Sequence, residues 1–237
     1  MIIERERFLK MFADAGIEIT DEQMYRLGMY SELLCAWNEK INLTAITDAE
    51  GISVKHFFDS IYPFSLVDIP KGCTLIDVGT GAGFPSCPVK IWREDIRLTL
   101  VDSLQKRITF LAQLSDTLSL GATCIHSRAE DLGRSGEFRE NFDIATARAV
   151  ANLSELCEYC LPLVKIGGRF IALKGSDADE EIKQAKEAVK LLGGKIAQTH
   201  TYTLPNGDGR TLIVIDKVSQ TPDKYPRNSA QIKKKSL

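Results

Sequence analysis

Hydrophobic residues recur at helical spacing through the first 70 residues of the chain. The stretches 4–16, 20–40 and 51–69 each place apolar side chains three or four residues apart, which is typical of amphipathic helices. Thr20 or Asp21 stands where a side chain can cap the second of them. We therefore expect an N-terminal helical extension over residues 1–70.

From residue 72 the pattern changes to short β-rich runs separated by amphipathic stretches. The runs lie at 74–79, 97–102, 123–127, 142–147 and 169–175. Strands that alternate with helices form βαβ units, so the pattern predicts an α/β fold with a mostly parallel sheet and helices on both faces. Intervening helices are expected over 86–95, 104–118 and 177–194.

The end of the chain departs from this alternation. Residues 195–218 read as two strands around a turn rich in Pro, Asn, Gly and Asp, which predicts a terminal hairpin with one antiparallel strand. We therefore place a sheet domain at 71–218 and a polar tail at 219–237.

Charge is nearly balanced overall, at −2, but it is unevenly spread. Residues 1–70 hold 6 Lys and Arg against 12 Asp and Glu, whereas residues 217–237 hold 6 basic residues and 1 acidic residue. Composition alone favours a solvated, disordered tail. A basic segment on a neutral body also suits local contact with a polyanion.

Several classes of protein are excluded by the composition. The first ten residues are charged throughout, and no apolar run reaches 18 residues, so neither a signal peptide nor a membrane span is expected. Of the six cysteines only Cys157 and Cys160 form a CxxC pair, and no second pair or His cluster completes a metal site. We expect buried structural cysteines, no metal and a cytoplasmic location.

The segment LIDVGTGAGFP, residues 75–85, carries the strongest chemical signal. Gly79, Gly81 and Gly83 follow Asp77 at every second position, between a predicted strand and a predicted helix. Such a turn lies at the carboxyl edge of a parallel sheet, where glycines allow close approach of a nucleotide-type ligand. The spacing differs from the G-x-G-x-x-G fingerprint of dinucleotide sites, and the Gly-Lys-Ser/Thr of a P-loop is absent.

Two further acidic positions follow the next two strands. Asp102 can accept hydrogen bonds from two ribose hydroxyls, and Glu130 or Asp131 can accept from an adenine amino group. Each could instead be a charge at a helix N-terminus. Three acidic positions after three successive strands make that alternative less favourable for the set.

These residues carry a family resemblance. The acidic residue and G-x-G-x-G turn resemble the first motif of class I S-adenosylmethionine-dependent methyltransferases. Segments in order over nearly the whole chain from Cys35 closely resemble the RsmG (GidB) family of bacterial 16S rRNA guanine-N7 methyltransferases: 38–47, 55–61, 77–85, 101–111, 128–132, the region around 143, 159–175 and 221–227. The resemblance implies a Rossmann-like seven-stranded fold, S-adenosylmethionine as cofactor, and guanine 527 in the 530 loop of the 30S subunit as target. We expect a monomer.

The resemblance also implies cofactor contacts. They fall on Gly79 and Phe84 in the turn, on Asp102, Ser103 and Leu104 at the ribose, on Ala129 and Glu130 at the adenine, and on Arg148 after the fourth strand. Arg148 suits either the methionyl carboxylate or an RNA phosphate. The chain departs from the family pattern GFPGIPLAI in reading GFPSCPVKI, with Ser86 and Cys87 at the changed positions.

The expected reaction needs no obvious general base. The chain lacks both the Asn/Asp-Pro-Pro motif of amino-group methylation after the fourth strand and a cysteine nucleophile there before Cys157. Guanine N7 carries a lone pair and no proton, so positioning and exclusion of water are sufficient.

Candidate RNA-side residues fall into two groups. The first would contact the target base: Asn38, Asn42, His56, Asp59 and Lys174. The asparagines could equally terminate a helix, and His56 could be a structural histidine. The second group would contact phosphates from the tail: Lys224, Arg227, Lys233, Lys234 and Lys235.

Three alternatives stay open on the sequence. The first is a class I methyltransferase with a small-molecule or protein substrate. The second is a dinucleotide-binding oxidoreductase, which the glycine spacing disfavours. The third is a non-catalytic RNA-binding or ribosome-assembly protein that keeps the cofactor fold.

Overall fold

The structure is a computed structural model that describes residues 3–148 and 151–237. Its strands are β1 (Thr74–Val78), β2 (Arg97–Asp102), β3 (Thr123–His126), β4 (Phe142–Arg148), β5 (Val164–Lys174), β6 (Gly194–Thr203) and β7 (Gly209–Lys217). They form a seven-stranded sheet in the order β3-β2-β1-β4-β5-β7-β6. β1 to β5 pair in parallel, and β7 runs antiparallel to both β5 and β6. The predicted parallel sheet and terminal hairpin are confirmed.

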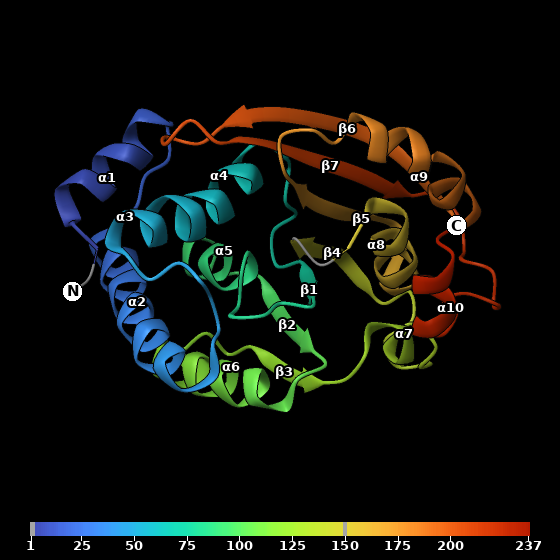
Figure 1. Ribbon diagram of the computed structural model, residues 1–237, viewed down its shortest axis with the longest axis horizontal. Helices are drawn as coiled ribbons and strands as arrows, with labels where there is room; N and C mark the ends of the chain where they lie inside the picture. The colour runs from blue at the N-terminus through green and yellow to red at the C-terminus, as the bar shows by residue number, and fades with distance from the viewer. Residues whose placement is uncertain (1–2, 149–150) are drawn as a thin grey trace.

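Helices cover both faces of the sheet (Figure 1). They are α1 (Arg5–Asp14), α2 (Asp21–Ile41), α3 (Ala49–Gly51), the π-helix η1 (Ile52–Phe58), α4 (Asp59–Ser65), α5 (Ser86–Trp92), α6 (Gln105–Thr117), α7 (Ala129–Leu132), α8 (Leu153–Cys160), the 3₁₀ turn η2 (Leu161–Leu163), α9 (Asp179–Leu191) and α10 (Ser229–Lys234).

The two faces have separate hydrophobic cores, because successive side chains of a strand point to opposite faces. In β7, Leu212 and Val214 join one core, and Ile213 and Ile215 join the other. The first core also contains buried residues of α1, α2, α4, α5 and α6. The N-terminal helices therefore share a hydrophobic core with one face of the sheet. The second is built with α8, α9 and α10.

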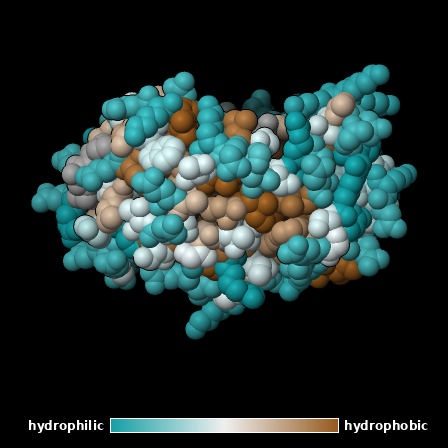
Figure 2. Space-filling model, turned by 90° about the horizontal axis from the view of Figure 1, so that it is seen from below, coloured by the Kyte–Doolittle hydropathy of each residue, from teal (hydrophilic) through white to brown (hydrophobic). Residues whose placement is uncertain are grey.

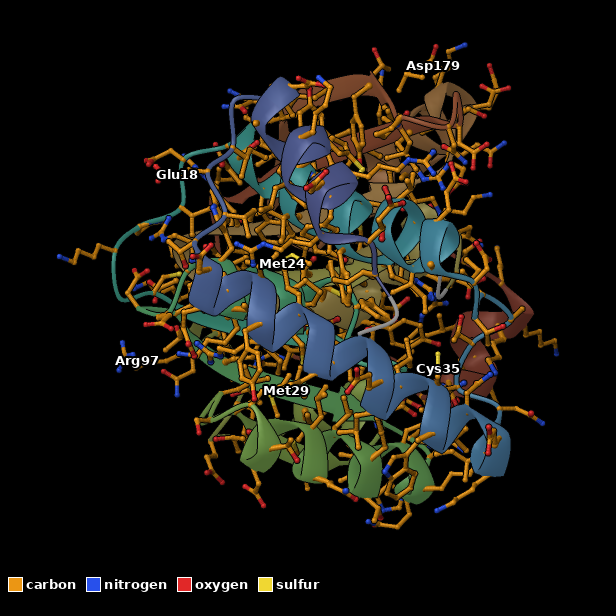
Figure 3. The ribbon with its side chains drawn as sticks, turned by 90° about the vertical axis from the view of Figure 1, so that its left-hand side faces the viewer. Glu18, Met24, Met29, Cys35, Arg97 and Asp179 are labelled. Atoms are coloured by element: carbon orange, nitrogen blue, oxygen red, sulfur yellow. The ribbon has the colours of Figure 1, made fainter. Side chains whose placement is uncertain are left out.

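Helix α2 positions the N-terminal segment against the sheet domain. Figure 3 shows it crossing the molecule between α1 and α6, with Met24, Met29 and Cys35 along its length. Thr20 caps it: the hydroxyl accepts from the Gln23 backbone N–H, and the Gln23 side chain accepts from the Thr20 N–H. Of the two proposed caps, Thr20 is therefore the one used.

The stretch predicted as one helix over 51–69 is divided. It begins as α3, continues as the π-helix η1 and resumes as α4, which ends at Ser65. π-helical turns are rare and occur often at functional sites. In the helix predicted over 104–118, Leu104 does not join the buried face; it precedes α6 and is 42% exposed.

Cys157 and Cys160 are free and fully buried, as expected for structural cysteines. The face in Figure 2 is mainly hydrophilic, with hydrophobic residues grouped near its middle. Among the described residues, no helix is long and apolar enough to cross a membrane.

Candidate functional site

The glycine turn connects β1 to α5, and two of its three glycines, Gly81 and Gly83, have different surroundings. All three have positive φ: 69° at Gly79, 61° at Gly81 and 94° at Gly83. A Cβ on Gly81 would meet nothing within 4 Å, which is the open space that a ligand needs. A Cβ on Gly83 would lie 2.7 Å from both Cys87 Sγ and Tyr30 Oη. Gly83 is therefore required by packing under the turn.

Asp77 lies beneath the turn and is fully buried. Its Oδ2 accepts hydrogen bonds from Thr80 Oγ1, at 2.8 Å, and from Ser86 Oγ. Its Oδ1 has no partner among residues 3–148 and 151–237. Burial raises the pKa of Asp77 to about 7, although the hydrogen bonds from Ser86 and Thr80 act in the opposite direction. Ser86, at a position where the chain departs from the family pattern, thus holds the acidic residue of the motif.

A pocket of about 200 Å³ opens at the carboxyl ends of β1 and β2. Gly79, Asp102, Ser103, Ala129 and Glu130 all line it, so five of the predicted cofactor residues meet at one place. Its other lining residues are Val78, Val101, Ser127, Arg128, Ala151, Glu155, Tyr159, Ser229 and Lys233.

Asp102 organises this pocket. Its carboxylate accepts from the N–H groups of Gly81, at 3.0 Å, and Leu104, at 2.9 Å, and from Arg107 at 3.1 Å. A carboxylate has about four acceptor positions, so it can still accept from a ligand hydroxyl. The open space at Gly81 and the remaining acceptor capacity of Asp102 fit an adenosyl cofactor.

A second pocket, of about 330 Å³, lies on the other side of the β4 terminus. His56, Asp59, Arg148 and Lys174 line it, so the structure brings together three candidate base-side residues and the predicted arginine. Sequence reasoning missed the other lining residues, which are Ile46, Lys55, Leu173, Gly175 and Arg210. Lys55 stands in the quoted segment 55–61, but nothing in the hairpin pattern singles out Arg210.

His56 is held in place by stacking. Its ring lies 4.3 Å from that of Phe84 with an angle of 12°, and Tyr30 stacks on Phe84 at 5.2 Å and 5°. His56 Nε2 lies 2.9 Å from Thr44 Oγ1. Burial, assisted by the positive charge of Arg148, lowers the pKa of His56 to about 3, so the imidazole is neutral near pH 7. Phe84, predicted as a cofactor contact, is buried between the rings of His56 and Tyr30.

Arg148 and Asp59 form the charged centre of the second pocket. Arg148 Nη1 lies 3.7 Å from Asp59 Oδ2 and donates to the Lys55 carbonyl oxygen at 3.2 Å. Asp59 also accepts from Arg210 Nε, at 3.1 Å, and from Tyr202 Oη, at 3.3 Å. Burial raises the pKa of Asp59 and lowers that of Arg148, while their mutual attraction opposes both shifts.

The two asparagines lie away from the pocket linings. Asn42 terminates α2 with a left-handed φ of 48°, and Asn38 Oδ1 accepts from the Thr44 N–H at 2.8 Å. Both contacts are those of a helix end. Asn38 is linked to the second pocket through Thr44, because the Thr44 hydroxyl is bonded to His56.

The basic segment at the end of the chain is packed against the body, so the interpretation as a solvated, disordered tail is wrong. Arg227 pairs with the fully buried Glu158, Tyr225 is buried, and Ile232 of α10 has no exposed surface. Lys224, Lys233, Lys234 and Lys235 are all exposed, and Lys233 also lines the first pocket. Composition gave the charge of this segment but not its anchor, since Glu158 lies 69 residues away.

The strand order and the pocket at the carboxyl ends of β1 and β2 define the class I methyltransferase fold. Solved structures agree on the fold: TrmN from Thermus thermophilus matches with a TM-score of 0.51 at 19% identity, over 66% of this chain and 47% of that chain. A predicted O-methyltransferase from Agrobacterium tumefaciens matches with a TM-score of 0.53 at 20% identity, over 69% and 82%.

Sequence comparison identifies the family. The family model of GidB, rRNA small subunit methyltransferase G, matches residues 23–208. The relative named ribosomal RNA small subunit methyltransferase G from Leuconostoc mesenteroides is 48% identical over 98% of both chains. Its namesake from Bacillus velezensis is 49% identical over 94% of both. This chain belongs to the rRNA small subunit methyltransferase G family. Residues 149–150, part of a segment on which the resemblance rests, lie outside the described residues.

Proposed function

We propose that this protein transfers a methyl group from S-adenosylmethionine to N7 of a guanine in 16S rRNA, guanine 527 of the 530 loop, without a covalent enzyme intermediate. The family and the names of its relatives support an rRNA methyltransferase. The finer assignment rests on one observation: the charged side chains of the second pocket are engaged in ion pairs, and burial lowers the pKa of His56 to about 3.

The cofactor would be held by the first pocket. Asp102 would accept from the ribose hydroxyls, Glu130 and Ala129 would face the adenine, and Gly79 and Gly81 would let the backbone approach. Ser103 belongs to the same wall, and Leu104 contributes its backbone. When bound, S-adenosylmethionine supplies an electrophilic methyl group on a sulfonium.

The second pocket would hold the target guanine. His56 is neutral at pH 7, Lys174 is bound to Glu181 at 2.7 Å, and Asp59 is bound to Arg210 and Arg148. Lys174 and Asp59 are thus already engaged in ion pairs, and an imidazole with a pKa of about 3 is a weak base near neutrality. Attack by N7 releases no proton, so a pocket that orients the base and excludes water is sufficient.

The target base must leave its stack to reach such a pocket. The exposed amines of Lys224, Lys234 and Lys235 are suited to phosphate contacts that position the RNA. Arg227 is less suited, because its guanidinium is bound to Glu158. A lower salt dependence of RNA binding after removal of the three lysines would test this role, since each phosphate contact contributes to the salt slope.

The reaction is tested by methyl transfer from labelled S-adenosylmethionine to 30S subunits that lack their own N7 methylation. The labelled nucleotide is then mapped by borohydride–aniline cleavage. Label at one guanine of the 530 loop would support the proposal. Asp102→Ala should abolish transfer, whereas Asp179→Asn, an exposed change at the periphery in Figure 3, should not affect it.

Other outcomes point to the alternatives. Transfer to a small molecule or protein in place of the subunit would favour a different methyltransferase. A protein that binds the subunit and S-adenosylhomocysteine but transfers no methyl group would favour a non-catalytic ribosome-binding protein.

A further inference from the structure

Two residues of the C-terminal helix α10 lie in the cofactor pocket. Ser229 and Lys233 line the same cavity as Asp102 and Glu130, although they follow these residues by about a hundred positions. They are four residues apart, so they share one face of α10. Figure 1 shows α10 beside α7 and α8, whose residues form adjoining parts of the wall.

The helix is fixed in this position from its own sequence. Asn228 and Gln231 form a reciprocal capping box that starts α10. Ile232 of α10 is fully buried in the second core. Arg128 Nη1 donates to Ser229 Oγ at 3.2 Å, which joins α10 to the residue that precedes α7.

The segment before α10 is fixed by an ion pair. Arg227 donates to Glu158 from Nε, at 2.9 and 3.2 Å, from Nη2, at 2.6 Å, and from its backbone N–H, at 2.8 Å. Glu158 has no exposed surface and lies on α8 next to Tyr159, which lines the pocket. A buried carboxylate requires such a partner, so this contact is a strong anchor.

A second set of contacts anchors the chain further upstream. Arg139 donates to the carbonyl oxygens of Thr221, at 2.6 Å, and Tyr225, at 2.8 Å. Lys217 Nζ donates to Thr221 Oγ1 and is bound to Glu140 at 3.0 Å. The path from β7 to α10 is therefore built into the body of the protein along its length.

From these contacts we infer that α10 is a wall of the cofactor pocket and that Ser229 and Lys233 contact the adenosyl part of the cofactor. The inference rests on the proposed function and adds residues to its cofactor site. The Lys233 ammonium is a hydrogen-bond donor at a pocket whose other charged lining is mostly acidic, with Asp102, Glu130 and Glu155. The adenosyl group presents ring nitrogens and ribose oxygens, which are acceptors for such a donor.

The consequence is that part of the basic segment serves the cofactor and not the RNA. Lys233 lines the pocket, whereas its neighbours Lys234 and Lys235 do not. The three lysines have the same charge, so long-range attraction of RNA is similar for each. Among these three lysines, only substitution of Lys233 should change the affinity for the cofactor.

The test is calorimetric titration of the purified full-length protein with S-adenosylhomocysteine, which needs no RNA and no turnover. Lys233→Ala should raise the Kd about tenfold, as expected for one lost hydrogen bond from a charged donor. Ser229→Ala should have a smaller effect in the same direction. The matched control Lys235→Ala should leave the Kd within about twofold of the wild-type value.

A truncation after Asn228 provides an independent measurement. It keeps the Arg227–Glu158 pair and removes α10, and it should raise the Kd by about twentyfold or more. Circular dichroism and a thermal melt check that it folds; if it does not, the point variants decide alone. Unchanged affinity in Lys233→Ala and Ser229→Ala would overturn the inference. Failure of the wild type to bind S-adenosylhomocysteine would instead overturn the proposed function.

Discussion

Because of His56, the free energy of unfolding of the wild type should fall by about 2 kcal/mol between pH 7 and pH 5. Replacing His56 by glutamine should remove this fall. The pKa of His56 is lowered to about 3 from an ordinary value of 6.5, chiefly by burial. The unfolded chain therefore binds a proton at this position as the pH falls below 6.5, and the folded protein does not. The stabilisation is fully present above pH 6.5 and is lost as the pH falls toward 3.

The assay is urea denaturation at a series of pH values, which gives the free energy of unfolding of each variant. The wild type should lose about 2 kcal/mol more than His56→Gln between pH 7 and pH 5. Thr44→Val is the matched control, because it removes the partner of Nε2 but keeps the imidazole. It should be less stable than the wild type at every pH and keep most of the wild-type slope.

Equal slopes for the wild type and His56→Gln would refute the reasoning. They would mean that the imidazole protonates in the folded state as readily as in the unfolded chain. His56 would then be available for proton transfer near neutrality, and the argument for a target pocket without a general base would fail.

Three further predictions follow from the turn and the C-terminal anchor. Gly83→Ala should destabilise the fold by about 1–3 kcal/mol in urea denaturation, because its Cβ would clash beneath the turn at a positive φ. Arg227→Gln should cost about 3 kcal/mol by the same measurement, and Glu158→Gln in the same chain should recover part of it by removing the unpaired charge. Ser86→Ala removes a hydrogen bond to Asp77, whose pKa is already raised, so we expect a loss of about 1–2 kcal/mol at pH 8 and less at pH 5 in a pH series. A Ser86→Ala loss that is larger at pH 5 than at pH 8 would contradict the last prediction.

The parts of the fold that sequence predicted well are those decided by local pattern. Alternation along a strand and the spacing of strands and helices are properties of neighbouring residues, so the parallel sheet and the hairpin could be read directly. The glycine turn is also local. Sequence could not distinguish Gly81, which faces open space, from Gly83, which packs on Cys87 and Tyr30, because the difference depends on α2.

The second pocket shows what local sequence pattern cannot give. Asp59 was a candidate from its segment, but its partner Arg210 lies 151 residues later, in a hairpin with no chemical motif. The π-helical form of η1 was also not predicted, since a helical hydrophobic pattern does not distinguish an i→i+4 from an i→i+5 ladder. Lys55 and His56 of η1 and Asp59, the first residue of α4, line one cavity.

Arg148 joins the second pocket to the residues around the glycine turn. Its guanidinium lies 5.1 Å from the ring centroid of Phe84, and its polar contacts are with Lys55, Ser60 and Asp59. A buried guanidinium needs compensating negative charge. Asp59 supplies it from the second pocket, and Asp77 supplies it from beneath the glycine turn. Binding of an anion to Arg148 would therefore compete with Asp59. This arrangement favours Arg148 as the residue that holds Asp59 in place and opposes the rise of its pKa, with a ligand carboxylate or phosphate as an additional partner and not the main one.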